Sequence, residues 1–505
     1  MMKTRLTACL LTALLSLAHM SAQTTLNPKD YGLDQARTGE ERYYALLRCH
    51  QDAVKKGADV SYAGVGEIFL EIPEGAASIP LTAKTDFAGT VMTVRNTRKN
   101  LTLFVMESPV HEVAVTKYMF ASGDFKSVPQ LRSGRKILII EDKTPWVENR
   151  KGYSYGAIRK DILVLENGKA RNSTVMPYTN KISQPSVTYF EASTEPRIFK
   201  NLDFRRTDDC TAKTFVCSFR NQYDVTIEKV SVTTNPGKLF GDSAISVSNS
   251  ADVDLNDITI NGTYSQIRDY GYGISLNNVY DVNVLRMFAR ANWGVFGTNN
   301  VQLATLRDCD INRFDIHCYG RDVRSYNCKY SKVYNQFSSV YGAVEFHNCE
   351  FTEFRPVLME SSYNAYTPFD IRFEGCTFNM DPGHFFMLTL LGLEEAHNSR
   401  PELDRKSLPN IDILGCTVNL PEGMTKWNII NTGKVAYKET LDYMDHLKIN
   451  GLTVNSASKP EFEFFTSPLR TTEKLKIDVR HMYWVRPDGQ KARYTMKNGN
   501  LLLNE

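Results

Sequence analysis

The sequence predicts an all-β solenoid, in which short strands repeat coil after coil. From about residue 220 onward, segments with apolar–polar–apolar alternation follow one another, and many of them end at Asn, Asp or Gly. Alternation with a period of two is typical of strands, and recurrence at roughly 20 residues is typical of solenoids. The repeats begin at Val225, Val253, Val282, Val301, Val323, Val344, Ile371, Ile411 and Leu447.

Cysteines recur at one position of the repeat. Equivalent positions of a solenoid stack about 4.8 Å apart, so these thiols are predicted to form an inward ladder that fills a corner. Zinc needs four ligands that converge tetrahedrally, which a linear stack does not provide, and parallel Cβ directions disfavour disulfides. Cys210 and Cys217 lie outside the ladder and could pair across a loop. The ladder consists of Cys309, Cys328, Cys349, Cys376 and Cys416.

The N-terminus has the features of a secretory signal. Lys3 and Arg5 precede a short apolar run at residues 6–17, and small residues follow before residue 23. The run is too short to span a bilayer, and the stretch before Cys9 is too short for lipid anchoring there. We therefore expect a secreted or periplasmic protein without a membrane span.

The charge balance excludes one class of partner. The chain has 60 basic and 57 acidic residues and a formal net charge of +3, whereas nucleic-acid binders carry a strong basic excess. No nucleic-acid partner and no cofactor are expected, and the protein is expected to be a monomer.

Four regions are predicted along the chain. Residues 1–22 form the signal peptide, and residues 23–200 form the entry and early coils with loop insertions, including a helix at residues 39–56. Residues 201–480 form the regular coils. Residues 481–505 form a terminal cap, because Pro487-Asp488-Gly489 and Asn498-Gly499 are hairpin signals.

The repeat pattern over about residues 200–480 resembles the single-stranded right-handed parallel β-helix of the pectate-lyase-like superfamily. Asp30-Tyr31-Gly32, ahead of the helical stretch, resembles the entry to that fold. The run RFDIHC, residues 313–318, is similar to a motif of β-helix proteins of gut Bacteroidota and of phage tails. The resemblance implies a right-handed parallel β-helix with a short N-terminal helix and a C-terminal hairpin cap. It implies a secreted polysaccharide-degrading protein, although the superfamily hosts lyases, hydrolases, esterases and non-catalytic spikes.

A second set of strands precedes the repeats, and RFDIHC belongs to it. Alternation predicts outward side chains at Asp315, His317 and Tyr319, with Arg313 at the strand's start and Arg321 just beyond its end. The residues predicted to point inward are Ile274, Leu276, Val295, Ile316 and Cys318. Those predicted to point outward on neighbouring coils are Phe296, Thr298 and Glu360.

This outward cluster combines residue types that suit proton transfer on an acidic sugar. His317 could act as base and Tyr319 as acid, Asp315 could tune the imidazole, and Arg313 could neutralise a carboxylate. The residues predicted to bind substrate are Arg321, Trp293, Phe296, Glu360 and Tyr363. Trp293 and Phe296 could instead pack beneath a loop.

Three functions remain open. β-Elimination on a uronic-acid polysaccharide is favoured, because the cluster is richer in Arg, His and Tyr than in paired acids. Hydrolysis would need two carboxylates about 5–5.5 Å or 6.5–9.5 Å apart, for which Asp315 and Glu360 are the candidates. A non-catalytic glycan-binding β-helix is the third.

His347 and Glu345 lie on the other strand set and are expected to face elsewhere, and no acidic cluster predicts a metal site.

Overall fold

The computed structural model describes most of the chain from residue 24 onward. The described residues are 24–97, 100–147, 157–174, 185–206, 214–234, 244–261, 272–290, 294–331, 335–337, 340–352, 357–360, 369–381, 386–391, 409–424, 426–431, 446–465, 475–497 and 500–504.

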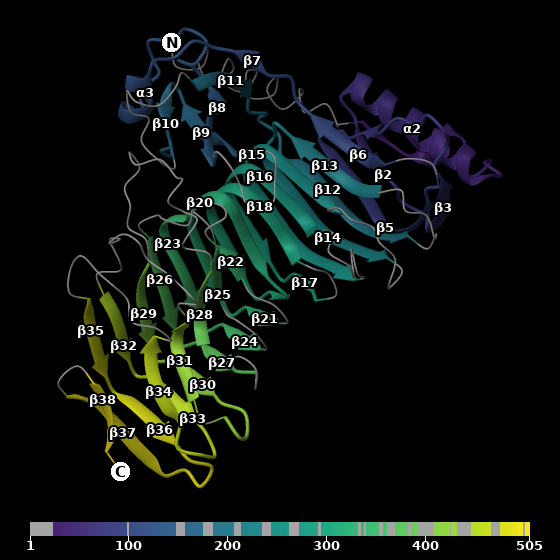
Figure 1. The fold of residues 1–505 in the computed structure, drawn as a ribbon. Coiled ribbons are helices and arrows are strands. Elements are labelled where there is room, and N and C mark those ends of the chain that lie inside the picture. Colours follow the sequence, from purple (N-terminus) through teal and green to yellow (C-terminus); the bar gives the residue numbers. More distant parts are fainter. Residues whose placement is uncertain are drawn as a thin grey trace, which may run out of the picture.

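Three parallel sheets run side by side along the molecule and enclose one apolar core (Figure 1). Each coil contributes a strand to the first sheet, then to the second, then to the third. Strands that turn a corner belong to more than one sheet, and they are β5 (Lys84–Arg95), β12 (Arg197–Arg206), β14 (Tyr223–Thr234), β15 (Ile245–Asn261), β16 (Tyr272–Leu285), β18 (Gly294–Arg307) and β20 (Phe314–Tyr326).

The remaining strands each belong to a single sheet. The first sheet holds β4 (Ile79–Pro80), β6 (Leu101–Glu107), β13 (Thr214–Arg220), β22 (Asn335–Phe337), β25 (Val357–Glu360), β28 (Phe386–Leu391), β31 (Lys426–Asn431) and β34 (Glu461–Phe465). The second holds β1 (Thr25–Leu26), β2 (Asp59–Ser61), β23 (Val340–His347), β26 (Phe369–Glu374), β29 (Asn410–Leu414), β32 (His446–Asn450) and β35 (Lys476–Arg480). The third holds β3 (Glu67–Glu71), β17 (Phe288–Ala289), β19 (Asp310–Ile311), β21 (Lys329–Ser331), β24 (Glu350–Thr352), β27 (Thr377–Asn379), β30 (Thr417–Asn419), β33 (Thr453–Asn455) and β36 (Met482–Val485).

An asparagine ladder forms the corner between the first and second sheets. Its four members have positive φ between 49° and 58°, a conformation that Asn tolerates better than most residues. The side-chain amides of the last three members each donate to the amide oxygen of the member before, at 3.3 Å from Asn249 to Asn221 and 3.0 Å from Asn278 to Asn249. The asparagine ladder consists of Asn221, Asn249, Asn278 and Asn300.

The predicted thiol ladder lies at the corner between the second and third sheets. Cys309, Cys328, Cys349, Cys376 and Cys416 are all buried free thiols. The residue before each one has positive φ (Asp308, Asn327, Asn348, Gly375, Gly415), which turns the chain and directs the thiol inward. Each Sγ contacts the carbonyl oxygen two residues earlier, at 3.2 to 3.6 Å. The prediction of an inward ladder is confirmed.

Cys217 is also a free, buried thiol, so it does not form the disulfide with Cys210 that the sequence left open. Cys210 itself lies outside the described residues. Burial raises the pKa of the Cys217 thiol, and a hydrogen bond with Cys328 together with burial raises the pKa of Cys309. Raised pKa values make these thiols poor nucleophiles.

Alkylation of these cysteines should therefore differ between the native and the denatured protein. In the native protein, iodoacetamide should leave Cys49, Cys217 and the five ladder thiols unmodified, because each is buried. In denaturant all seven should react. Mass spectrometry of the peptides measures both states, and a ladder cysteine alkylated under native conditions would contradict the placement.

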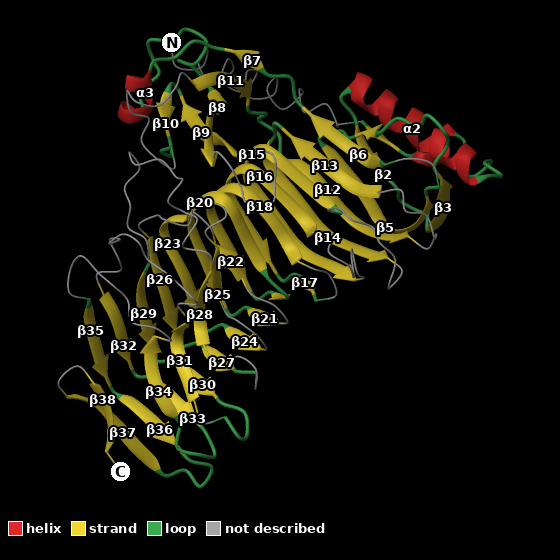
Figure 2. Ribbon diagram, viewed as in Figure 1, coloured by secondary structure: helices red, strands yellow, loops and turns green. Residues whose placement is uncertain are grey.

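The N-terminal helix covers the open end of the first coil (Figure 2). Helix α2 spans Gly39–Lys56, the predicted range, and follows the short 3-10 helix η1 (Pro28–Tyr31). Thr38 and Glu41 form a capping box at its start, and Gly57 ends it with φ of 59°. Its buried face includes His50, whose pKa burial lowers to about 4. The apolar edge of the solenoid is thus shielded from water at this end.

A five-stranded antiparallel sheet packs on the outer side of the second sheet, opposite the core; we call it the appended sheet. It is formed by β7 (His111–Glu112), β8 (Arg135–Val147), β9 (Ala157–Glu166), β10 (Lys169–Ala170) and β11 (Pro185–Glu191), and helix α3 (Lys117–Ser122) packs against its far face. Isoleucines of β8 and β9 meet Tyr223, Ala251 and Tyr280 of three consecutive coils. The appended sheet is therefore anchored to the β-helix by an apolar interface.

The C-terminal end is covered by an antiparallel meander. β36 pairs with β37 (Lys491–Lys497), which pairs with β38 (Asn500–Asn504), and Gly489 sits in the first turn with φ of 83°. The predicted hairpin cap is confirmed. No helix among the described residues is long and apolar enough to cross a membrane.

Candidate functional site

The run RFDIHC enters β20 at Phe314, in the first sheet. Phe314 and Ile316 pair with Phe296 and Thr298 of the preceding coil, and their side chains belong to the core. Asp315 therefore lies on the outer side of the strand, as alternation predicts.

Arg313 and Asp315, however, are not exposed. They are 1% and 0% exposed, and they form an ion pair in which Arg313 Nε lies 2.6 Å from Asp315 Oδ2 and Nη2 also donates to that oxygen. The ring of Tyr272 covers this region: a Cβ on Gly294 or Gly297 would lie 2.8 or 2.4 Å from its carbons. The prediction that Arg313 and Asp315 are exposed on the outer face is wrong, because the Tyr272 ring covers this part of the strand and the two buried charges pair with each other.

For β18 the prediction holds at Val295, which belongs to the core, but fails at the two outward positions. Phe296 and Thr298 were expected to point outward, but both are fully buried, and Phe296 packs edge-on against Phe314 with ring centroids 5.1 Å apart. Phe296 pairs with Ile274, which also points inward. Phe296 therefore cannot stack on a sugar, and the alternative that it is a packing residue is correct.

A row of hydrogen-bonding side chains crosses the outer side of the first sheet; we call it the amide row. Ser248 pairs with Asn277, Asn277 with Asn299, and Asn299 with His317 on four consecutive coils. Asn299 is exposed, and its Nδ2 donates to Asn277 Oδ1 at 2.8 Å. The backbone of His317 thus continues a row that is open to solvent at Asn299, while its side chain lies outside the described residues.

The amide row ends beside a β-bulge. Asn299 pairs with His317 and Val301 pairs with Gly320, so Cys318 and Tyr319 together oppose Asn300 alone. The asparagine ladder also stops here, because neither residue of the bulge continues it. Bulges are frequent beside active sites, where they redirect a side chain. Sequence alternation alone could not reveal the extra residue.

Several predicted residues lie outside what the structure describes. Trp293 and Tyr363 fall in segments that are not described, as does the side chain of Tyr319. The backbone of Glu360 lies in β25 and pairs with Leu391, but its side chain is not described. Their predicted roles stay predictions.

Arg321 belongs to the second sheet, around the corner from the amide row. It pairs with Gln302, and its Nη1 donates to Ser173 Oγ at 2.7 Å and to the Thr174 carbonyl at 3.2 Å. Its Nε lies 3.7 Å from Asp322 Oδ2. Arg321 lines a cleft of about 520 Å³ between the appended sheet and the β-helix. The structure therefore separates Arg321 from the face on which His317 lies.

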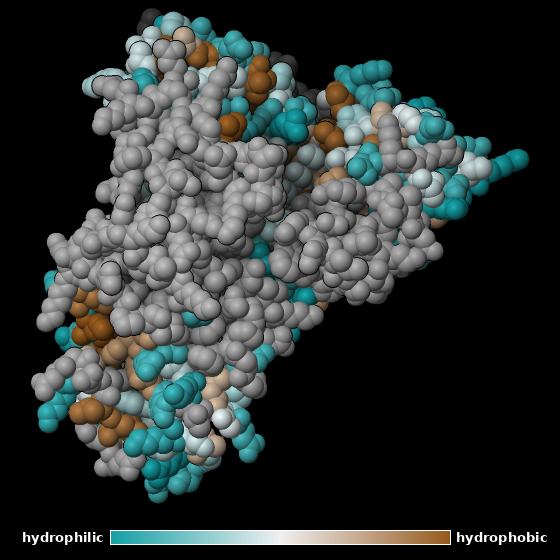
Figure 3. Space-filling view, viewed as in Figure 1, coloured by the Kyte–Doolittle hydropathy of each residue, from teal (hydrophilic) through white to brown (hydrophobic). Residues whose placement is uncertain are grey.

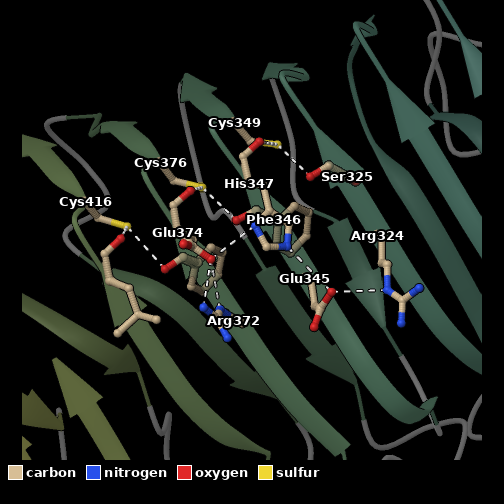
Figure 4. Close-up of polar contacts among 12 residues, drawn as sticks. Arg324, Ser325, Glu345, Phe346, His347, Cys349, Arg372, Glu374, Cys376 and Cys416 are labelled. Carbon is tan, nitrogen blue, oxygen red and sulfur yellow. Dashed lines mark hydrogen bonds and ion pairs between the residues drawn. The ribbon is translucent and has the colours of Figure 1, made fainter. Parts of the chain in front are cut away.

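A group of charged residues lies further along the outer side of the second sheet (Figure 4). His347 Nδ1 lies 3.3 Å from Glu374 Oε2, and its Nε2 lies 3.6 Å from Glu345 Oε2. Arg324 pairs with Glu345 at 3.2 Å, and Arg372 pairs with Glu374 at 2.8 Å. His347 and Glu345 face away from the first sheet, as expected. Because each carboxylate already has an arginine partner, this ionic cluster is best explained as a cross-strand charge network.

The described residues give no candidate metal centre and no broad apolar face. No group of three or more His, Cys, Asp or Glu side chains within the described ranges is placed to hold a metal ion. In the space-filling view, hydrophilic side chains predominate around α2 and at the C-terminal end (Figure 3). Large apolar side chains that are exposed come from separate elements, such as Phe69, Tyr118 and Phe288. The described surface is mainly suited to polar partners.

Comparisons with known proteins identify the fold and no more. No family model matches the chain, and none of the curated proteins matches it. The structure is similar to tailspike gp49 from Pseudomonas phage LKA1, with a TM-score of 0.61 and 13% identity over 90% of this chain and 81% of that one. It is also similar to tailspike gp61 from Pseudomonas phage phi297, with a TM-score of 0.51 and 11% identity over 86% and 81%. The chain is a right-handed parallel β-helix.

Proposed function

We propose that the chain is an exported carbohydrate-active protein that binds an acidic polysaccharide along the amide row and cleaves it by β-elimination. The amide row is the observation that carries this proposal. Asn277, Asn299 and the His317 backbone occupy one outward position on consecutive coils, and such positions repeat about every 4.8 Å. An extended glycan lying across the coils would meet a hydrogen-bonding group at each coil. Amide groups both donate and accept, which suits sugar hydroxyls.

His317 is assigned as the base and Tyr319 as the acid. The base removes the C5 proton of the uronate, the C4–O bond breaks as the C4=C5 double bond forms, and the acid protonates the leaving oxygen. A general base of this kind typically contributes about 10²–10⁴-fold to the rate. Tyr319 follows His317 by two residues, and it lies in the backbone bulge that Cys318 and Tyr319 form. The cation that neutralises the uronate is assigned to no described residue.

Arg313 and Asp315 act through His317 in this proposal. Asp315 lies two residues before His317 on β20, and Arg313 immediately precedes that strand, so this buried ion pair fixes the strand rather than touches the sugar. This burial also weighs against hydrolysis by Asp315 and Glu360, since a carboxylate bound to a buried arginine is a poor acid or nucleophile. β-Elimination needs no such pair of carboxylates.

The products distinguish the three functions. The purified protein would be incubated with a panel of uronic-acid polysaccharides, including pectins and glycosaminoglycans. Ultraviolet absorbance from a new C4=C5 double bond is the expected result. New reducing ends without that absorbance would make the protein a hydrolase. Glycan binding with neither product would make it a binding protein and would contradict the proposed catalysis.

A further inference from the structure

The cleft between the appended sheet and the β-helix has an unfilled hydrogen-bonding group. It is lined on the β-helix side by Tyr280, Gln302 and Arg321, which pair in register on three consecutive coils. The appended sheet contributes Asn172 from the segment that follows β10. This cleft lies on the second sheet, so it is separate from the amide row.

The backbone fixes the orientation of both amides in the cleft. Asn172 Oδ1 accepts from the Val164 N–H at 2.9 Å, and Asn172 Nδ2 donates to the Ile162 carbonyl at 2.9 Å. Asn172 Nδ2 therefore faces Gln302 as a donor, at 3.3 Å from Gln302 Oε1. Gln302 must in turn present its Nε2 away from Asn172.

Among the residues that the structure describes, none is a hydrogen-bond partner of Gln302 Nε2, although Gln302 is only 2% exposed. Leaving a buried donor unpaired is energetically costly, so such a group commonly marks the place of a ligand or ordered water. Since Gln302 lines the cleft, a bound acceptor can satisfy it. The required chemistry is an oxygen that accepts a hydrogen bond from an amide.

The charges around the cleft already balance one another. Arg171 pairs with Asp252 at 2.9 Å and with Asp281 at 3.2 Å, and its guanidinium lies 5.8 Å from the Tyr280 ring centroid. Arg321 has Asp322 beside it. Within the described part of the cleft, each arginine already has an aspartate partner, so no net positive charge attracts the carboxylate of a ligand. The occupant that fits is uncharged and rich in hydroxyl groups.

We propose that this cleft is a second carbohydrate-binding site for one or two uncharged sugar residues, in which a sugar oxygen accepts a hydrogen bond from Gln302 Nε2. Its volume of about 520 Å³ falls in the range of about 300–1,000 Å³ typical of small-molecule sites. The aromatic ring of Tyr280 and the side chain of Leu303 offer apolar contact, and Arg321 offers a further donor on the next coil.

Calorimetric titration with neutral trisaccharides (maltotriose, cellotriose, mannotriose) and with trigalacturonate tests the proposal. At least one neutral trisaccharide should bind, and its affinity should not change with salt. Gln302→Met should weaken it roughly tenfold, as expected for loss of one hydrogen bond from a buried donor. Thr305→Val, also on β18 but outside the cleft, should leave the affinity unchanged, and thermal melting should confirm that both variants fold.

Absence of binding by every neutral trisaccharide would overturn the proposal. An affinity that Gln302→Met leaves unchanged would overturn it too, as would loss of trisaccharide binding in Asn299→Ala instead of Gln302→Met. Tighter, salt-sensitive binding of trigalacturonate that Gln302→Met abolishes would also contradict the proposal. Cleavage at the amide row is measured separately by the new double bond, so absence of sugar binding in the cleft would not contradict the proposed cleavage. If the wild-type protein formed no double bond, the proposed sugar-binding site in the cleft would be unaffected.

Discussion

Arg313→Met is expected to lower the free energy of unfolding by about 3–5 kcal/mol, because it leaves the Asp315 carboxylate buried without its arginine. Asp315 is fully buried, and its Oδ2 accepts hydrogen bonds from both Nε and Nη2 of Arg313. A carboxylate that loses this partner must either stay charged in a poorly solvated site or take up a proton. Denaturant unfolding followed by circular dichroism measures the change.

Two controls separate the buried charge from other effects of the substitution. The double variant Arg313→Met/Asp315→Leu removes both charges and should recover most of the lost stability, since apolar replacement of a buried pair is often neutral. Arg324→Met breaks a partly exposed ion pair with Glu345 and should cost less than about 1 kcal/mol. If Arg313→Met cost no more than Arg324→Met, the buried pair would have no structural role.

His317→Ala is expected to lower kcat/KM for the acidic glycan by about 10²–10⁴-fold, the usual contribution of a general base. Proton removal from the sugar is the step that this side chain is proposed to perform, so binding should weaken far less than turnover. Initial rates of double-bond formation at several substrate concentrations separate the two effects.

His347→Ala is the matched control for this substitution. His347 lies on the second sheet between Glu345 and Glu374, away from the amide row. Its removal should leave the rate within about twofold of wild type, because His347 lies on a different sheet from the proposed reacting groups. Equal losses in both variants would mean that His317 has no specific part in the reaction.

The sequence predicts the fold well because each coil repeats the same local instructions. Asn, Asp or Gly before each ladder cysteine turns the chain, and the alternation on either side sets the sheets. Helix 39–56 was predictable from its caps, Thr38 with Glu41 and Gly57. The appended sheet was not recognised, because β8 and β9 are buried on both faces and have no counterpart in the repeat.

The site was predicted less accurately, for physical reasons that lie outside any single strand. Gly294, Val295 and Phe296 are all buried, so alternation carries no information about which of them faces the core. The sequence predicts an exposed Arg313, but Tyr272, which lies two coils earlier, covers it. The orientation that leaves Gln302 Nε2 unpaired is set by Asn172, which is 130 residues away in the sequence. Such contacts depend on how neighbouring coils and the appended sheet meet.

A crystal structure of His317→Ala with a bound uronic-acid oligosaccharide tests the central claim most directly. The account predicts sugar density on the outer side of the first sheet, with hydroxyl groups hydrogen-bonded to Asn277 and Asn299 and a uronate beside residue 317. Sugar bound on the ionic cluster of the second sheet, or only in the cleft beside Gln302, would contradict the placement of the site on the amide row.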